Sequence, residues 1–145
     1  QTLPLELNSQ ELEQLGCQGM ELVVYGYLPV MTSAQCIQKT TDRCTHRPGL
    51  LRMRDRTGKD LPVKNRCTFC YNTIYNTTPL MLFGYGKELQ KADFSNFRLN
   101  FTVESEEEVR QILAIYETVF YEGRKNLADV YQGEYTNGHY KRGVE

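Results

Sequence analysis

The sequence lacks an uninterrupted apolar segment of the roughly 18 residues that a membrane-spanning helix needs, and it does not open with a secretory signal pattern. It also has no glycine-rich phosphate loop, no serine, histidine and aspartate in a known triad order, and no H-E-x-x-H zinc motif. The sequence also has no excess of positive or of negative charge, because its net charge is −1. We therefore expect no membrane partner, and composition alone names no reaction.

What is present is ordinary for a soluble domain. The 145 residues are 40% hydrophobic and 24% charged, which predicts a single domain over residues 1–145, and the strand and helix patterns make it an α/β domain. Because the chain starts at Gln1 without a methionine, we expect it to be a fragment of a longer protein. An odd number of cysteines with one C-x-x-C pair argues against a secreted disulfide framework and indicates a cytoplasmic location.

Four of the five cysteines are concentrated in one stretch with the spacing C-x7-C-x22-C-x2-C: Cys36, Cys44, Cys67 and Cys70. Four thiolates can close a tetrahedral metal site or an iron–sulfur site, and the short last pair has the spacing that such sites commonly use. The wider spacing of the first pair, Cys36 and Cys44, argues against a zinc ribbon. An iron–sulfur cluster remains a candidate. The alternative is a set of unligated buried thiols. His46 could replace a cysteine ligand, although a surface-loop histidine is the favoured interpretation, and Cys17 is expected to be a core residue.

Residues 9–15 predict a short helix after Asn8 that stops at Gly16, and residues 20–25 predict a strand buried on both faces. Residues 28–31 are expected to form a loop. Residues 97–103 alternate as a strand does, and Ser105 with Glu108 predicts a capping box on a helix that runs to about Tyr121. Such parallel βαβ units, with an insertion at 27–80, predict part of a (β/α) barrel. A barrel fragment would tend to form homodimers.

The insertion carries a basic segment. Residues 39–66 hold nine lysines or arginines against three aspartates, although the whole chain is nearly neutral. Residues 50–54 and 61–64 flank a turn at Gly58 and predict a β-hairpin. This hairpin would expose Arg52, Arg54, Arg56 and Lys59, which we predict as an RNA-binding face. The alternative is an ordinary solvated surface.

Several motifs carry a resemblance to a known family. The run from Glu21 to Gly26, followed ten residues later by Cys36, resembles the hallmark of the U-32 peptidase family, the collagenase-like proteins. The resemblance continues through residues 55–59, 61–63, 74–80 and 138–143 and covers nearly the whole chain. It places the chain in the C-terminal part of the family's core region.

The resemblance implies two functional pictures. The older one is a peptidase acting on collagen-like or other protein substrates. The newer one is an enzyme that hydroxylates a pyrimidine of tRNA or rRNA and carries a 4Fe–4S cluster on four cysteines. The family has a cysteine at the position of Pro29, and Cys70 is the substitute that we nominate here. A zinc-stapled interaction module without catalysis is the third hypothesis, and the fragment alone is expected to be inactive.

Overall fold

The computed structural model describes residues 1–123 and 125–142. The chain divides into two compact units. The first unit combines Gln1–Gly26 with the described residues from Pro79 onward, and the second unit is Tyr27–Thr78. The second unit falls within the region that the sequence marks as an insertion at 27–80.

The first unit contains a three-stranded sheet with the order β6-β1-β7. Strand β1 (Glu21–Gly26) is parallel to β7 (Asn96–Leu99) and antiparallel to β6 (Leu80–Met81). Val24 is fully buried at the centre of β1, as a strand covered on both faces requires. The chain is thus mixed α/β, and the described residues form no closed barrel.

Helices surround this sheet, and their ends follow the expected caps. Helix α1 (Ser9–Leu15) begins at the capping box of Asn8 with Glu11 and ends at Gly16. Helix α4 (Glu106–Ile115) begins at the capping box of Ser105 with Glu108. The remaining helical segments of this unit are η1 (Phe83–Tyr85), α3 (Gly86–Lys91), the π-helix η2 (Tyr116–Tyr121) and α5 (Leu127–Val130).

The core of the first unit is aromatic. Phe83 lies 6.0 Å from Tyr25 and 6.2 Å from Phe120, measured between ring centroids. Phe120 in turn meets Phe97 edge-on at 4.8 Å. These rings join β1, β7, η1 and η2, so the sheet and its covering helices share one set of contacts.

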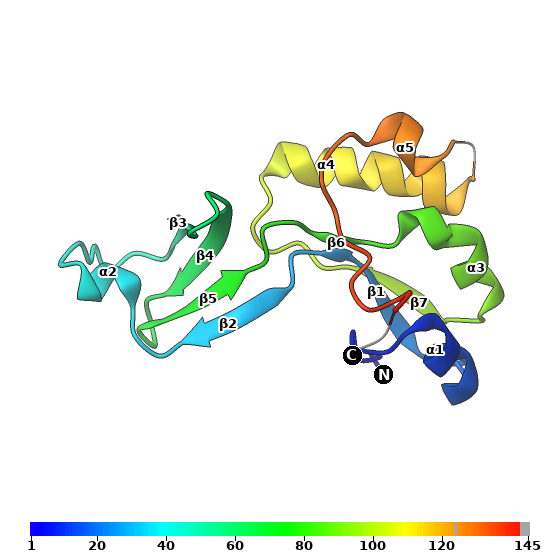
Figure 1. Ribbon diagram of the computed structural model, residues 1–145, viewed down its shortest axis with the longest axis horizontal. Helices are drawn as coiled ribbons and strands as arrows, with labels where there is room; N and C mark the ends of the chain where they lie inside the picture. The colour runs from blue at the N-terminus through cyan, green and yellow to red at the C-terminus, as the bar shows by residue number, and fades with distance from the viewer. Residues whose placement is uncertain (124, 143–145) are drawn as a thin grey trace. The chain divides into compact units, whose positions relative to one another are not determined.

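The second unit is a four-stranded antiparallel sheet with the order β2-β5-β4-β3. Figure 1 shows its strands as β2 (Pro29–Ser33), β3 (Gly49–Arg54), β4 (Asp60–Arg66) and β5 (Tyr71–Tyr75). The short helix α2 (Ile37–Thr40) lies between β2 and β3 in the chain. The predicted hairpin is confirmed as β3–β4, with Gly58 in the turn at a φ of +83°.

Two predictions about strands are wrong. Residues 28–31 are not a loop, because Pro29–Ser33 forms strand β2 at the edge of the second sheet, where a proline at the start costs no ladder hydrogen bond. The strand expected at 97–103 ends at Leu99, since its partner β1 ends at Gly26 and offers no further pairing.

Candidate metal centre

The four cysteines of the cluster all belong to the second unit and come from two segments. Cys36 is buried at the N-cap position of α2, and Cys44 is half-buried in the loop that follows that helix. Cys67 and Cys70 lie in the turn between β4 and β5, where Cys67 is half-buried and Cys70 is exposed. Cys70 adopts a positive φ of +51° and its backbone N–H donates to the Cys67 carbonyl, which closes the turn.

The thiol of Cys67 is the point where these segments meet. Burial raises the pKa of Cys67, and negative charge on Cys44, Cys36 and Cys70 raises that pKa further. Each of the other three thiols is therefore within electrostatic range of the Cys67 sulfur. Cys36, Cys44 and Cys70 thus all act on the Cys67 thiol from within the second unit.

The sulfurs do not form a ready ligand set. Within residues 1–123 and 125–142, no group of three or more histidine, cysteine, aspartate or glutamate side chains could hold a metal ion as it stands. Coordination by all four thiolates requires the α2 segment and the β4–β5 turn to close on one another, as is common where metal binding completes the local fold. His46 is exposed in the α2–β3 loop with a φ of +56°.

A pair of asparagines supports the cysteine segments, and the sequence analysis did not single them out. Asn65 and Asn72 are cross-strand partners in β4 and β5, and both side chains are 0% exposed. They flank the turn symmetrically in the sequence, two residues before Cys67 and two residues after Cys70. Asparagine is rare inside strands, so this pattern was the available signal.

Asn65 connects three parts of the unit through hydrogen bonds. Its Nδ2 donates to Gln38 Oε1 on α2 at 2.9 Å, to the Arg47 carbonyl at 3.3 Å and to Cys67 Sγ at 3.3 Å. Its Oδ1 accepts from the backbone N–H of Gly49. One side chain therefore holds helix α2 and the following loop against the turn that carries Cys67.

Asn72 fixes the other end of the cysteine segment. Its Nδ2 donates to the Gln35 carbonyl at 2.7 Å, directly before Cys36. Its Oδ1 is buried without a hydrogen-bond partner among the described residues, which is an uncommon and costly arrangement for an amide oxygen. Together the two asparagines position Cys36 and Cys67, and Asn72 Oδ1 is left as a buried acceptor without a partner among the described residues.

The predicted RNA-binding residues Arg52, Arg54, Arg56 and Lys59 are all exposed on the β3–β4 hairpin. Arg54 is already paired, because its Nε and Nη2 donate to the two Asp60 oxygens at 2.8 Å and 3.1 Å. The guanidinium of Arg54 lowers the pKa of that carboxyl. Asp55 accepts hydrogen bonds from the backbone of Thr57 and Lys59 and shapes the turn.

Two further features concern single residues. Phe69, between Cys67 and Cys70, is 77% exposed although it is a large aromatic residue, and its ring stacks on Tyr71 at 6.4 Å. Cys17, in the first unit, is buried and donates to the Leu12 carbonyl at 3.2 Å. The prediction that Cys17 is a core residue is confirmed.

Comparisons with known proteins add no relative. The chain matched no protein-family model, and searches of curated proteins and of solved structures also found no match. No described helix has both the length and the apolar character needed to cross a membrane.

Proposed function

We propose that the second unit binds a 4Fe–4S cluster through Cys36, Cys44, Cys67 and Cys70. We further propose that the chain is the C-terminal portion of a U-32 family protein that hydroxylates a pyrimidine of RNA. The observation that supports the first part is that Cys36, Cys44 and Cys70 each raise the pKa of the Cys67 thiol electrostatically, inside one compact unit.

The surroundings of Cys67 suit a thiolate-bound cluster. The N–H of Asn65 donates to the Cys67 sulfur, and hydrogen bonds to ligating sulfurs both orient them and tune the reduction potential of a cluster. The cluster would supply electron-transfer chemistry or a site for substrate. Cys36, Cys44, Cys67 and Cys70 would hold the cluster. The α2 segment would cover it and limit the access of water.

The same unit offers groups that suit RNA. Arg52, Arg56 and Lys59 are exposed cations on the hairpin, and cations of this kind neutralise phosphates. The exposed ring of Phe69 can stack on an unpaired base, as aromatic residues do in proteins that bind single-stranded nucleic acid. Both kinds of contact lie within residues 27–78, the unit that carries the cysteines.

The parallel pair of strands in the first unit supports a portion of a (β/α) barrel that a longer chain would complete, although β6 pairs antiparallel with the other edge of β1, unlike a strand of such a barrel. Strands β1 and β7 are parallel, and helix α3 precedes β7 as a crossover helix would. This arrangement supports the proposal that the active enzyme is a longer protein, whose barrel would place its chemistry at the carboxyl ends of the strands.

The deciding experiment is iron, zinc and acid-labile sulfide analysis of protein that has been purified without oxygen. A brown preparation that contains iron and sulfide, with a broad absorption near ~400 nm, is expected for thiolate-bound clusters. Stoichiometric zinc without colour would replace this proposal with a zinc-stapled module, and absence of both metals after reconstitution would reject the centre. Dose-dependent cleavage of collagen or casein by the metal-free protein would favour the peptidase.

A further inference from the structure

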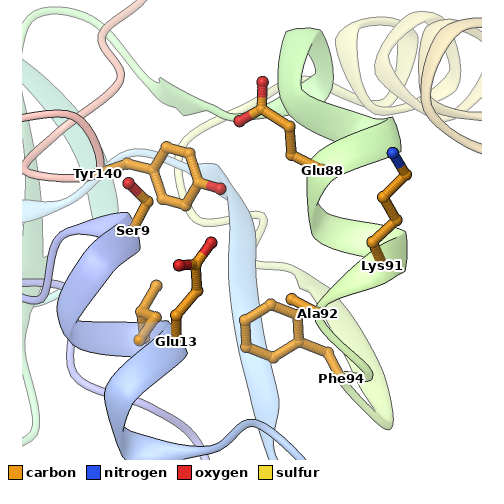
Figure 2. A pocket seen from close by; sticks show the side chains of 8 residues that line it. Ser9, Glu13, Glu88, Lys91, Ala92, Phe94 and Tyr140 are labelled. Atoms are coloured by element: carbon orange, nitrogen blue, oxygen red, sulfur yellow. The ribbon is translucent and has the colours of Figure 1, made fainter.

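A pocket of about 370 Å³ lies in the first unit, apart from the cysteines and independent of the proposed cluster. Helix α1 and helix α3 supply most of its walls. It is lined by Ser9, Leu12, Glu13, Glu88, Lys91, Ala92, Phe94 and Tyr140. Figure 2 shows the hydroxyl of Tyr140 and the carboxylate of Glu13 pointing into the space between the two helices.

Tyr140 is held firmly, and its hydroxyl points into this pocket (Figure 2). The residue is 8% exposed, its carbonyl accepts from the backbone N–H of Ser9 at 2.8 Å, and its ring lies 5.0 Å from that of Tyr85. Among the described residues its hydroxyl has no hydrogen-bond partner. The Tyr140 ring is buried and its hydroxyl opens onto the pocket (Figure 2), so a ligand there can gain a hydrogen bond at little cost.

The pocket is also negative. Glu13 and Glu88 reach it from opposite walls, and neither carboxylate forms an ion pair or a side-chain hydrogen bond within residues 1–123 and 125–142. Burial, followed by the charges of Glu88 and Glu13, raises the pKa of Tyr140 to about 12. The phenol therefore stays protonated at neutral pH, and the field that keeps it so attracts cations. Lys91 supplies one opposing charge against the two carboxylates.

We propose that this pocket binds a short alkylammonium ion, a primary amine on an unbranched apolar chain. The ammonium group takes the position between Glu13, Glu88 and the Tyr140 oxygen, which accepts one of its N–H groups. The alkyl chain lies against Leu12, Ala92 and Phe94. The phenol ring of Tyr140 and the ring of Phe94 add aromatic surface, which cations favour.

A divalent metal ion suits this pocket less well than an amine. The described residues hold no group of three carboxylate, histidine or cysteine ligands that could bind a metal here. Leu12, Ala92 and Phe94 make much of the remaining wall apolar, and such a wall cannot replace the water that a small divalent cation would have to lose. An alkylammonium ion needs only two or three acceptors and gains from burying its methylene groups.

The test compares three probes of equal length, namely pentylamine, pentanol and pentanoate, by isothermal titration calorimetry and amide chemical shifts on the full chain. Pentylamine should bind saturably and perturb residues around Ala92 and Tyr140, whereas pentanoate should not. Glu13→Gln and Glu88→Gln should each weaken the amine about two- to five-fold, as partly exposed charge pairs do. Tyr140→Phe should weaken it by a similar factor.

Two further variants make the test decisive. Lys91→Gln removes the opposing charge and should tighten amine binding, whereas it would weaken the binding of a ligand with an anionic group. Glu107→Gln is the matched control, because Glu107 is an exposed glutamate on α4 outside the pocket. Equal binding of all three probes, or unchanged amine affinity in the Glu13→Gln/Glu88→Gln protein, would overturn the proposal. Neither result depends on iron, so the proposed cluster is tested separately.

Discussion

The side-chain amide of Asn65 donates a hydrogen bond of 3.3 Å to the sulfur of Cys67, and the same nitrogen also donates to Gln38 on helix α2. Asn65 is 0% exposed, whereas Cys67 and Gln38 are half-buried. The order of the cysteine segments therefore depends on a side chain that is not itself a ligand.

Asn65→Asp should disrupt this arrangement. The carboxylate keeps the acceptor for Gly49 but replaces the N–H donors with an oxygen facing Gln38, Arg47 and Cys67. We expect the free energy of unfolding to fall by about 2–4 kcal/mol, because a buried charge then faces acceptors. Chemical denaturation without metal measures this. The control is Asn96→Asp on the exposed start of β7, and equal stability of the two variants would contradict the assigned role.

Replacement of single cysteines should separate ligands from core residues. Cys36→Ser, Cys44→Ser, Cys67→Ser and Cys70→Ser should each lower the iron and sulfide retained after anaerobic reconstitution, since each removes a thiolate. Cys17→Ala should retain the full content and lose only stability, because burial raises the pKa of the Cys17 thiol and it serves as core. Full iron content in any one of the four serine variants would remove that cysteine from the ligand set.

The capped helices could be predicted from the sequence because their signals are local, and the cysteine site stays a prediction. The capping boxes of α1 and α4 each involve residues three apart, and C-x-x-C is a short-range motif. Strand β2 escaped prediction because it exists only through its pairing with β5, some forty residues later in the chain. Its exposed residues carry no periodic apolar pattern of their own.

Asn65 and Asn72 illustrate what local patterns cannot supply. Each is a poor strand former, and each acquires its role only when β4 and β5 align and place the two side chains as cross-strand partners. Their flanking positions around the C-x-x-C turn are visible in the sequence. Their burial is not, because it depends on α2 and the following loop covering the same face of the sheet.

The hairpin prediction can be sharpened by the Arg54–Asp60 ion pair. Since Arg54 is already neutralised in part, Arg52→Ala with Arg56→Ala should weaken RNA binding more than Arg54→Ala alone. Each lost phosphate contact should reduce the salt slope of single-stranded RNA binding by about 0.7. Filter binding at several salt concentrations measures the slope. The control is Lys87→Ala in the first unit, and equal slopes in all proteins would reject the hairpin as the RNA contact.

Gly26 should be intolerant of any side chain. Its φ is +148°, and a Cβ there would clash with the carbonyl oxygen of Asn100 where β1 and β7 end together. Gly26→Ala should cost more than about 2 kcal/mol of stability, because it combines backbone strain with a steric clash. Gly84→Ala is the matched control, since only Leu127 lies near and at 4.0 Å. Comparable melting temperatures for the two variants would show that β7 can shift away from the added methyl group without loss of stability.

The raised pKa of Tyr140 links the pocket to stability at high pH. Its pKa is about 12 in the folded chain, with burial as the largest cause and the charges of Glu88 and Glu13 next, and about 10 in an unfolded chain. Below pH 10 the phenol is neutral in both states, so its contribution to stability is fully present. As the pH rises from about 10 to 12, the unfolded chain releases this proton and the folded chain does not, so stability falls.

The Tyr140→Phe protein should lose this part of the fall in stability at high pH. In a titration followed by phenolate absorbance, it should also lack one phenol among those that ionise at the highest pH. If the titration of the wild-type protein and that of Tyr140→Phe differ only near pH 10, the phenol is not buried as the structure has it.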